Sequence, residues 1–198
     1  MAGGSTDAAA VLVGVNRMFD LGFTKKELME RGVKLGADVP YCIMRGTALS
    51  EGIGEILTEL PAPPQCHLVI AKPQISVSTK AVYGKLRVNE LAPEEHPDID
   101  GMMESIKNGD LDGVIGRLGN VLETVTVPDH PEIAEIKKVM MENGACGSLM
   151  SGSGPTVFGI YKDKEQAEKA CQVLRDADGG RLTRQVYLTE FYNRKKAR

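Results

Sequence analysis

A proline-rich segment, Pro61-Ala62-Pro63-Pro64, divides the chain of 198 residues into two unequal parts. Proline fixes its own φ angle and lacks the N–H group that helices and sheets use. Three prolines in four residues therefore exclude a regular element at this point. A chain of this length can bury one or two hydrophobic cores. We expect one domain over residues 1–60 and another over residues 65–198.

The larger part alternates between strand and helix patterns. Apolar runs predict strands at residues 67–71, 147–150, 157–161 and 183–188. Helical spacing and caps predict helices at residues 80–86, 99–108, 111–116, 131–143 and 164–177, and a loop at residues 89–97. The order strand, helices, strand, strand, helix, strand is close to a ferredoxin-like α+β unit, an antiparallel sheet covered by helices.

The smaller part combines helices with short strands. Apolar residues at helical spacing predict a helix at residues 8–19, and Thr24 and Glu27 form a capping box that begins a second helix ending near Lys34. Because Pro40 restricts the residue before it, we expect extended backbone at Val39. Strands are expected at residues 42–44, 47–49 and 56–60.

Composition excludes several classes of function. The chain is 42% hydrophobic and 26% charged, which is typical of a soluble globular protein, and its net charge of −3 provides no basic field for nucleic acid. The sequence contains neither a signal-peptide pattern nor an apolar run of about 20 residues, so we expect a cytoplasmic protein with no membrane partner. Its four cysteines lie far apart and indicate neither a zinc site nor a disulfide framework. We expect the basic tail, residues 194–198, to be a solvated end.

Glycines and hydroxyl side chains stand directly before the first expected helix, in the segment Gly3-Gly4-Ser5-Thr6-Asp7. Glycine lets the backbone approach a ligand closely, and serine, threonine and aspartate are common N-cap residues. The N–H groups at a helix start favour anions. This segment therefore indicates a phosphate site, with an ordinary capped helix as the alternative.

Two further segments carry polar residues next to glycine. Asp38 lies in Leu35-Gly36-Ala37-Asp38-Val39-Pro40, where a carboxylate among apolar neighbours needs a partner or a function; a turn or helix-cap aspartate is the alternative. Ser151-Gly152-Ser153-Gly154-Pro155-Thr156 forms a second glycine loop between two expected strands.

In this order, the three segments resemble the motifs of the GHMP kinase superfamily. Residues 2–9 are similar to the end of its phosphate-binding loop, residues 35–40 to the segment with its catalytic aspartate, and residues 151–156 to its third motif. The resemblance implies a GHMP kinase-like α+β fold. Residues 1–60 would be the remainder of an ATP-binding domain of the ribosomal protein S5 domain 2-like type, and residues 65–198 a ferredoxin-like C-terminal domain.

The resemblance also implies roles for individual residues in phosphoryl transfer from ATP with Mg²⁺. Asp38 would be the catalytic residue that accepts the proton of the attacking hydroxyl or orients it. Asp7 would be a helix cap, a helper near Mg²⁺, or both. No metal ligand of the chain's own is assigned. The ATP phosphates would be bound or supported by Ala2, Gly3, Gly4, Ser5, Thr6, Gly152, Ser153 and Gly154.

Three further segments narrow the range of expected substrates. Residues 36–42, 48–55 and 73–79 resemble one branch of the family, which phosphorylates the 2-hydroxyl of cytidine diphosphate methylerythritol in non-mevalonate isoprenoid synthesis. Thr79 would line the methylerythritol site, cap the helix that follows, or do both. The alternatives are a kinase for a mevalonate-type or homoserine-type alcohol, and a non-catalytic binding module. The sequence does not give the oligomeric state, and a homodimer is one option.

Relative to the family pattern, the sequence lacks counterparts of several N-terminal features. These are the first strands, the adenine-contacting segment, a lysine near the catalytic aspartate and the side chains that hold the cytosine ring. We therefore expect the chain as written to be inactive or weakly active, and we expect the apolar faces of the helices at residues 8–19 and 24–34 to be partly exposed.

Overall fold

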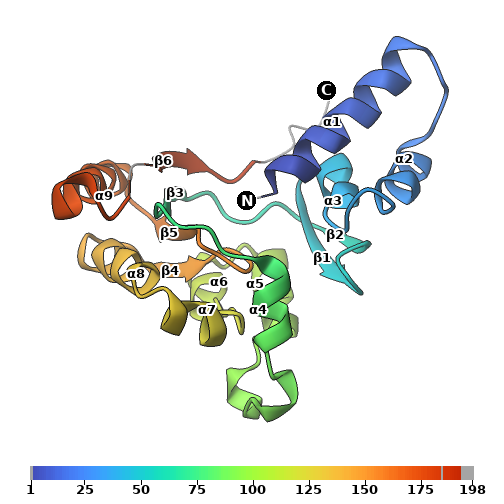
Figure 1. Cartoon of the computed structure of the whole chain (residues 1–198). Helices are drawn as coiled ribbons and strands as arrows, with labels where there is room; N and C mark the ends of the chain where they lie inside the picture. Colours follow the sequence, from blue (N-terminus) through green and yellow to red (C-terminus); the bar gives the residue numbers. More distant parts are fainter. Residues whose placement is uncertain (1, 184, 193–198) are drawn as a thin grey trace. The chain divides into compact units, whose positions relative to one another are not determined.

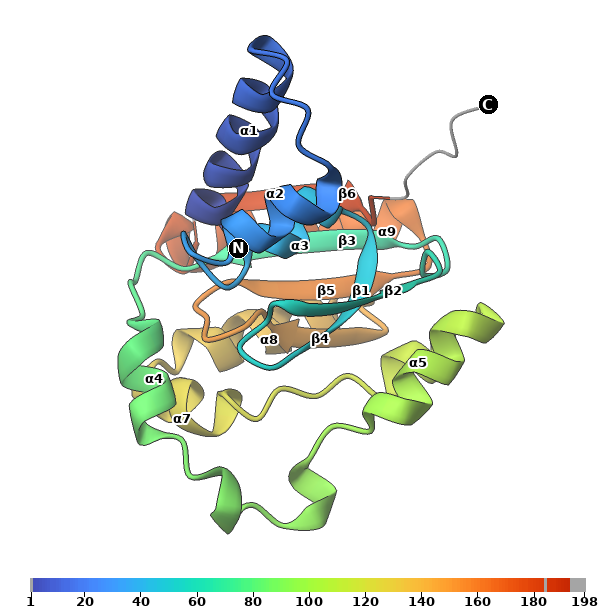
Figure 2. The same cartoon turned by 90° about the vertical axis from the view of Figure 1, so that its right-hand side faces the viewer.

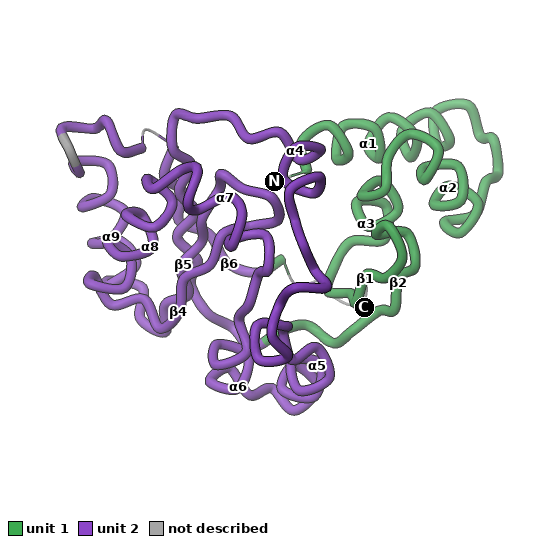
Figure 3. The backbone as a smooth tube through the Cα atoms, turned by 60° about the horizontal axis from the view of Figure 1, so that its bottom comes forward, with its two compact units in different colours: residues 1–63, 192–198 green, residues 64–191 purple. Residues whose placement is uncertain are grey.

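The computed structural model describes residues 2–183 and 185–192 and contains two compact units (Figures 1 and 3). The first unit extends to Pro63 and includes Tyr192, and the second covers residues 64–191. The division coincides with the proline-rich segment, while the expected domain limits at residues 60 and 65 stay a prediction. Met1 and the basic tail, residues 194–198, lie outside the described residues.

The first unit consists of three helices and a hairpin. Its elements are α1 (Gly3–Met18), α2 (Lys25–Gly32), α3 (Val39–Met44), β1 (Thr47–Glu51) and β2 (Ile56–Leu60). The two strands pair antiparallel, and they confirm the strands expected at residues 47–49 and 56–60. A small apolar cluster joins the three helices through Ala9, Leu28, Val39 and Ile43.

The capping box of α2 is confirmed. The backbone N–H of Glu27 donates to Thr24 Oγ1 at 3.2 Å, and the backbone N–H of Thr24 donates to Glu27 Oε2 at 2.8 Å. The Thr24 hydroxyl also donates to Glu27 Oε2 at 2.8 Å. The backbone N–H of Thr24, and after it this hydroxyl, lower the pKa of the Glu27 carboxyl.

The strand expected at residues 42–44 is wrong, because these residues belong to α3. Pro40 stands in the first turn of this helix, where its missing N–H group is not needed. Val39 is helical rather than extended and is 1% exposed, since it packs into the cluster between the helices. Tertiary packing thus overrides the local preference of a residue before proline.

The outer face of α1 is apolar and exposed. Val11, Val15 and Met18 follow one another at helical spacing, and Phe19 continues the same surface. The expected partial exposure of this helix is confirmed.

The second unit is an antiparallel sheet covered by helices, which confirms the ferredoxin-like α+β prediction. Its strands lie in the order β4-β5-β3-β6, one beside the next (Figure 2). In the central pairings, Val69 of β3 lies opposite Gly159 of β5 and Leu188 of β6. The strands are β3 (His67–Lys72), β4 (Gly147–Met150), β5 (Val157–Tyr161) and β6 (Gln185–Glu190).

Most helices of this unit follow the sequence prediction, and α7 is an addition to it. They are α4 (Thr79–Lys85), α5 (Ile99–Asn108), α6 (Leu111–Gly116), α7 (Glu123–Asp129), α8 (Glu132–Glu142) and α9 (Lys164–Asp176). Short 3₁₀ turns interrupt the loop expected at residues 89–97, at Val88–Glu90 and Pro93–Glu95. Asp163 caps α9, since its side chain accepts a hydrogen bond from the backbone N–H of Gln166 at 2.9 Å.

Successive residues of the strands face opposite sides of the sheet. Val69 belongs to the larger core, together with α8 and α9, whereas Leu68 belongs to a second cluster that contains residues of α6. The largest buried side chains of the larger core include Ile133, Ile136, Met140, Tyr161 and Leu174. The sheet is therefore covered on both faces, and the loop between β4 and β5 extends from a rigid base.

Candidate functional site

Helix α1 begins at Gly3, and its first turn contains the glycines expected to bind phosphate. The expectation that a helix beginning near residue 8 is capped by Ser5, Thr6 or Asp7 is wrong, because α1 starts earlier. Ala2 occupies the N-cap position and no side chain caps the helix. Thr6 instead donates from both its backbone N–H and its hydroxyl to the carbonyl of Ala2, each at 2.9 Å. The N–H groups of a first helical turn have no acceptor within the helix, so they are available to an anion.

The space over this first turn is open. Gly3 and Gly4 are exposed, and a side chain built at either position would meet no atom within 4 Å. A phosphate group could therefore approach the backbone there.

The segment that contains Asp38 lies next to this helix start. Gly36, two residues before it, is so close to Ser5 that an added Cβ would lie 4.0 Å from Ser5 Oγ. A second contact joins α1 to α3, since Thr6 Oγ1 and Cys42 Sγ are 3.6 Å apart. The structure thus brings the phosphate segment and the Asp38 segment together within the first unit.

The Asp38 carboxylate is exposed and faces the turn between β1 and β2. Asp38 occupies the N-cap position of α3, but its side chain makes no capping hydrogen bond, so the capping alternative is wrong. Gly54 in that turn has φ +115°, and an added Cβ would lie 3.7 Å from Asp38 Oδ1. Glycine at this position lets the turn adopt a conformation that other residues avoid.

The second glycine loop, residues 151–156, belongs to the second unit and joins β4 to β5. The backbone N–H of Ser151 donates to the carbonyl of Thr156 at 2.8 Å, and that of Gly154 to the carbonyl of Ser151 at 3.0 Å. Gly154 has φ +86°, and an added Cβ would lie 2.7 Å from Met150 Sδ. Only glycine fits this position without strain.

Side chains from distant segments hold this loop. Asn120 Nδ2 donates to the carbonyls of Met150 and Gly152, both at 2.8 Å, and Thr126 Oγ1 donates to the carbonyl of Ser153 at 3.2 Å. Sequence reasoning missed Asn120 and Thr126. An asparagine beside Gly119 and a threonine in an apolar run are weak signals, because their partners lie about 30 residues away.

Thr79 also contacts the loop. Its hydroxyl oxygen lies 2.9 Å from that of Ser153. Thr79 is the first residue of α4, and Ser78 caps the helix by accepting from the N–H of Ala81 at 3.3 Å. The alternative that Thr79 caps this helix is therefore wrong.

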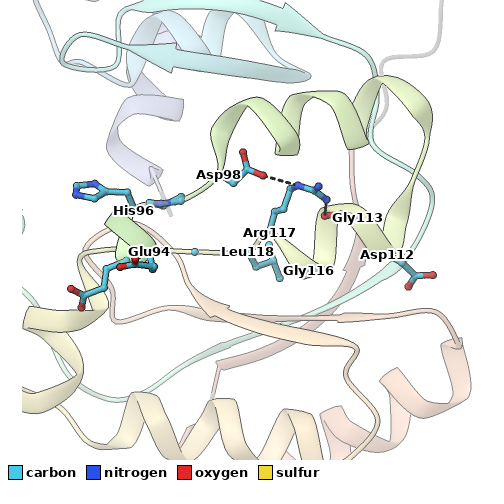
Figure 4. Close-up of a pocket in the computed structure, with 11 residues that line it drawn as sticks. Glu94, His96, Asp98, Asp112, Gly113, Gly116, Arg117 and Leu118 are labelled. Atoms are coloured by element: carbon cyan, nitrogen blue, oxygen red, sulfur yellow. Dashed lines mark hydrogen bonds and ion pairs between the residues drawn. The ribbon is translucent and has the colours of Figure 1, made fainter. Parts of the chain in front are cut away.

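A separate hollow of about 520 Å³ lies in the second unit, beside α5 and α6 (Figure 4). Asp98 and Arg117 face each other there, and Arg117 Nε donates to Asp98 Oδ2 at 2.9 Å. Hydrogen bonds from the backbone of Gly101 and from Arg117 lower the pKa of the Asp98 carboxyl. The Arg117 guanidinium is thus already neutralised by the Asp98 carboxylate. Three further carboxylates are among the residues that line the hollow, those of Glu94, Glu95 and Asp112.

Two general features bear on ligands and location. Within residues 2–183 and 185–192, no group of three or more His, Cys, Asp or Glu side chains could hold a metal ion. In the same part of the chain, no helix is both long and apolar enough to cross a membrane.

Comparison with known families agrees with the motifs. The family model described as the GHMP kinases N terminal domain matches residues 1–46, and the model described as GHMP kinases C terminal matches residues 102–178. The two matches together span more than half of the chain. The chain therefore belongs to the GHMP kinase family, and the resemblance seen in its motifs is confirmed.

Individual relatives within this family share one name. The chain is 57% identical to the 4-diphosphocytidyl-2-C-methyl-D-erythritol kinase of Lachnospira eligens, over 97% of the chain and 65% of the relative. It therefore spans about two thirds of that relative's length.

Solved structures support the same assignment. A crystal structure of 4-(cytidine 5'-diphospho)-2C-methyl-D-erythritol kinase superposes with a TM-score of 0.78 and 28% identity, covering 97% of this chain and 66% of the other. The homoserine kinase of Cytophaga hutchinsonii superposes with a TM-score of 0.75 at 20% identity, covering 93% and 64%. The second similarity concerns the fold alone.

Proposed function

We propose that this chain takes part in the transfer of the γ-phosphoryl group of ATP to the 2-hydroxyl of 4-diphosphocytidyl-2-C-methyl-D-erythritol. The observation that carries the proposal is the 57% identity, over nearly the whole chain, to a kinase with this substrate in its name. Because the chain spans 65% of that relative, the activity is proposed for a site to which this chain contributes.

The first turn of α1 would receive the ATP phosphates. The free backbone N–H groups of this turn and the hydroxyl of Ser5 favour an anion, and the open space over Gly3 and Gly4 accommodates one. The Thr6 hydroxyl would take part only by giving up its hydrogen bond to the Ala2 carbonyl. Bound Mg²⁺ would neutralise charge on the transferred group, and it usually needs only one or two protein ligands besides the phosphates. The absence of a cluster of three ligands among the described residues is compatible with that mode.

Asp38 would act on the acceptor hydroxyl. Its carboxylate is exposed and is not used to cap α3, so it is available to accept a proton or to orient the attacking oxygen. Phosphoryl transfer depends mainly on positioning and on charge stabilisation. The first unit would therefore need to supply only one carboxylate to act on the acceptor hydroxyl.

The glycine loop and Thr79 are the candidate site residues of the second unit. Gly152, Ser153 and Gly154 would support the phosphates, and Thr79 would line the methylerythritol site. Their shared hydrogen bond, between the hydroxyls of Thr79 and Ser153, supports a common function for these two segments of the second unit.

A homoserine or mevalonate kinase is the second candidate. The TM-score of 0.75 to a homoserine kinase favours it only at the level of the fold, since the identity is 20%. The two candidates differ in the acceptor alcohol, which an assay can distinguish.

The test is phosphoryl transfer from γ-labelled ATP to three acceptors: the cytidine diphosphate alcohol, mevalonate and homoserine. The Lachnospira eligens relative serves as the positive control. We expect label only on the cytidine diphosphate alcohol, at a lower rate than for the longer relative. Label on mevalonate or homoserine would favour the second candidate, and no transfer with no ATP binding would refute a kinase role.

A further inference from the structure

The segment before α7 reaches across the second unit to the glycine loop. We propose that Asn120 is a positioning residue that sets the conformation of this loop and the direction of the Ser153 N–H group. The link to catalysis rests on the proposed function, whereas the effect on the loop is independent of it.

Asn120 is itself held in place. Its Oδ1 accepts a hydrogen bond from the backbone N–H of Leu122 at 3.0 Å, and Leu122 is buried in the larger core. With the acceptor side of the amide fixed in this way, Nδ2 points at the loop and donates to two carbonyls, those of Met150 and Gly152. A single side-chain amide therefore binds the carbonyls of the residues directly before and after Ser151.

Because the peptide bond is planar, the contact with the Gly152 carbonyl also fixes the direction of the Ser153 N–H group. In a trans peptide, the C=O group and the following N–H group point in opposite directions. Because the carbonyl of Gly152 faces Asn120, the N–H of Ser153 faces away from Asn120. Among the described residues, that N–H group has no hydrogen-bond acceptor, so it is available to a ligand.

Helix α7 provides two further supports. Thr126 is 1% exposed and donates to the carbonyl of Ser153, and Glu123 Oε1 accepts from the backbone N–H of Met150 at 2.7 Å. Lys137 in turn donates to Glu123 Oε2 at 2.5 Å. The carbonyls of residues 150, 152 and 153 are thus all directed towards the segment 120–126.

The substitution Asn120→Asp tests the proposal. It keeps the size of the side chain and the oxygen that accepts from Leu122, but it removes both donors to the loop. Asn143→Asp is the matched control, because Asn143 donates to the carbonyl of Val139 at 2.8 Å, at the end of α8. The two variants make the same chemical change at different places.

The first readout is backbone hydrogen exchange of the full chain. We expect the amides of Ser151 and Gly154 to exchange roughly ten times faster in Asn120→Asp than in the wild type, and at the wild-type rate in Asn143→Asp. Equal rates in the wild type and Asn120→Asp would overturn the proposal. If Asn120→Asp does not fold, Thr126→Val removes one donor to the same loop, and faster exchange of Gly154 is again expected.

The second readout is the dissociation constant of the magnesium complex of a non-hydrolysable ATP analogue. We expect roughly tenfold weaker binding for Asn120→Asp and no change for Asn143→Asp. Faster exchange with unchanged nucleotide affinity would overturn the catalytic part of the inference. A wild-type chain that binds no nucleotide would contradict the proposed function, while the exchange rates would still decide the role of Asn120 in the loop.

Discussion

The hydroxyl oxygens of Thr79 and Ser153 lie 2.9 Å apart, although 74 positions separate the two residues in the sequence. Thr79 begins α4, and Ser153 lies at the centre of the loop between β4 and β5. The proposed function places Thr79 at the acceptor alcohol and Ser153 near the phosphates. Because a hydrogen bond joins them directly, a substitution in either segment should alter the stability of the other.

A double-mutant cycle with Thr79→Val and Ser153→Ala measures this bond. We expect each single substitution to lower the free energy of unfolding by about 0.5–1.5 kcal/mol, because each removes the same hydrogen bond. The double variant should lose less than the sum of the two. Urea denaturation of the four proteins gives the coupling, and strict additivity would show that the two hydroxyls do not interact in solution.

Asp38→Asn separates catalysis from folding. We expect phosphoryl transfer to fall by at least about 100-fold, because the amide cannot accept the proton of the attacking hydroxyl. Stability should change by less than about 0.5 kcal/mol, since the side chain is exposed and caps nothing. A transfer assay and thermal unfolding check the two parts, and a variant with unchanged transfer would remove Asp38 from the mechanism.

Gly154→Ala and Gly84→Ala should have opposite effects. Gly154 has φ +86° and lies against Met150, so alanine there should cost about 1–3 kcal/mol of unfolding free energy. Gly84 lies within α4, where an added Cβ meets no atom within 4 Å, so alanine should stabilise by up to about 1 kcal/mol. Chemical denaturation of both variants tests the geometry, which would be contradicted by two effects of the same sign.

The Asp98–Arg117 pair predicts a specific dependence on pH. The hydrogen bonds to Asp98 lower its pKa in the folded state, so the group stabilises the fold above its unfolded pKa of about 3.9. That stabilisation is lost as the pH falls through the lower folded pKa. Asp98→Asn keeps a capping side chain for α5 but removes the charge. Its melting temperature should lie below that of the wild type at pH 7, and the difference should shrink below about pH 4. A difference that stays constant from pH 7 to pH 2.5 would contradict the role of the charge.

The cysteines should differ in reactivity. Burial raises the pKa of the Cys66 thiol to about 11, so on the order of one thiol in a thousand is ionised at pH 8. Cys146 is exposed. We expect iodoacetamide to label Cys146 much faster than Cys66, as measured by mass spectrometry of peptides, and to label both at similar rates after denaturation. Equal labelling of the native protein would show that Cys66 is more accessible than its burial indicates.

Local sequence was sufficient to predict a structural feature where a short segment contains both partners of the interaction. The capping box of Thr24 and Glu27 lies within one helical turn, and Asp163 caps α9 through a backbone N–H three residues later. Apolar runs in the strands of the second unit were equally informative, because each run lies within a single strand. The order of the three glycine-containing motifs identified the family.

Tertiary structure decided the features whose partners are remote in sequence. Residues 42–44 have strand-like composition, but packing of Val39 and Ile43 against α1 and α2 makes them helical. The start of α1 at Gly3 was not predicted, because glycine has a low helix propensity. The hydrogen bonds of Asn120 and Thr126 to the glycine loop span about 30 residues, and no local pattern records them.

The sequence by itself therefore determined the α+β class, the family and the chemical types of the expected site residues, because these depend on local patterns and motif order. Only the tertiary structure decided that Asp38 is free of a capping role, that Thr79 contacts Ser153, and that Asn120 holds the glycine loop. The physical reason is that a hydrogen bond between distant segments depends on the fold that brings them together, whereas a helix cap or an apolar run is contained in a short stretch of sequence.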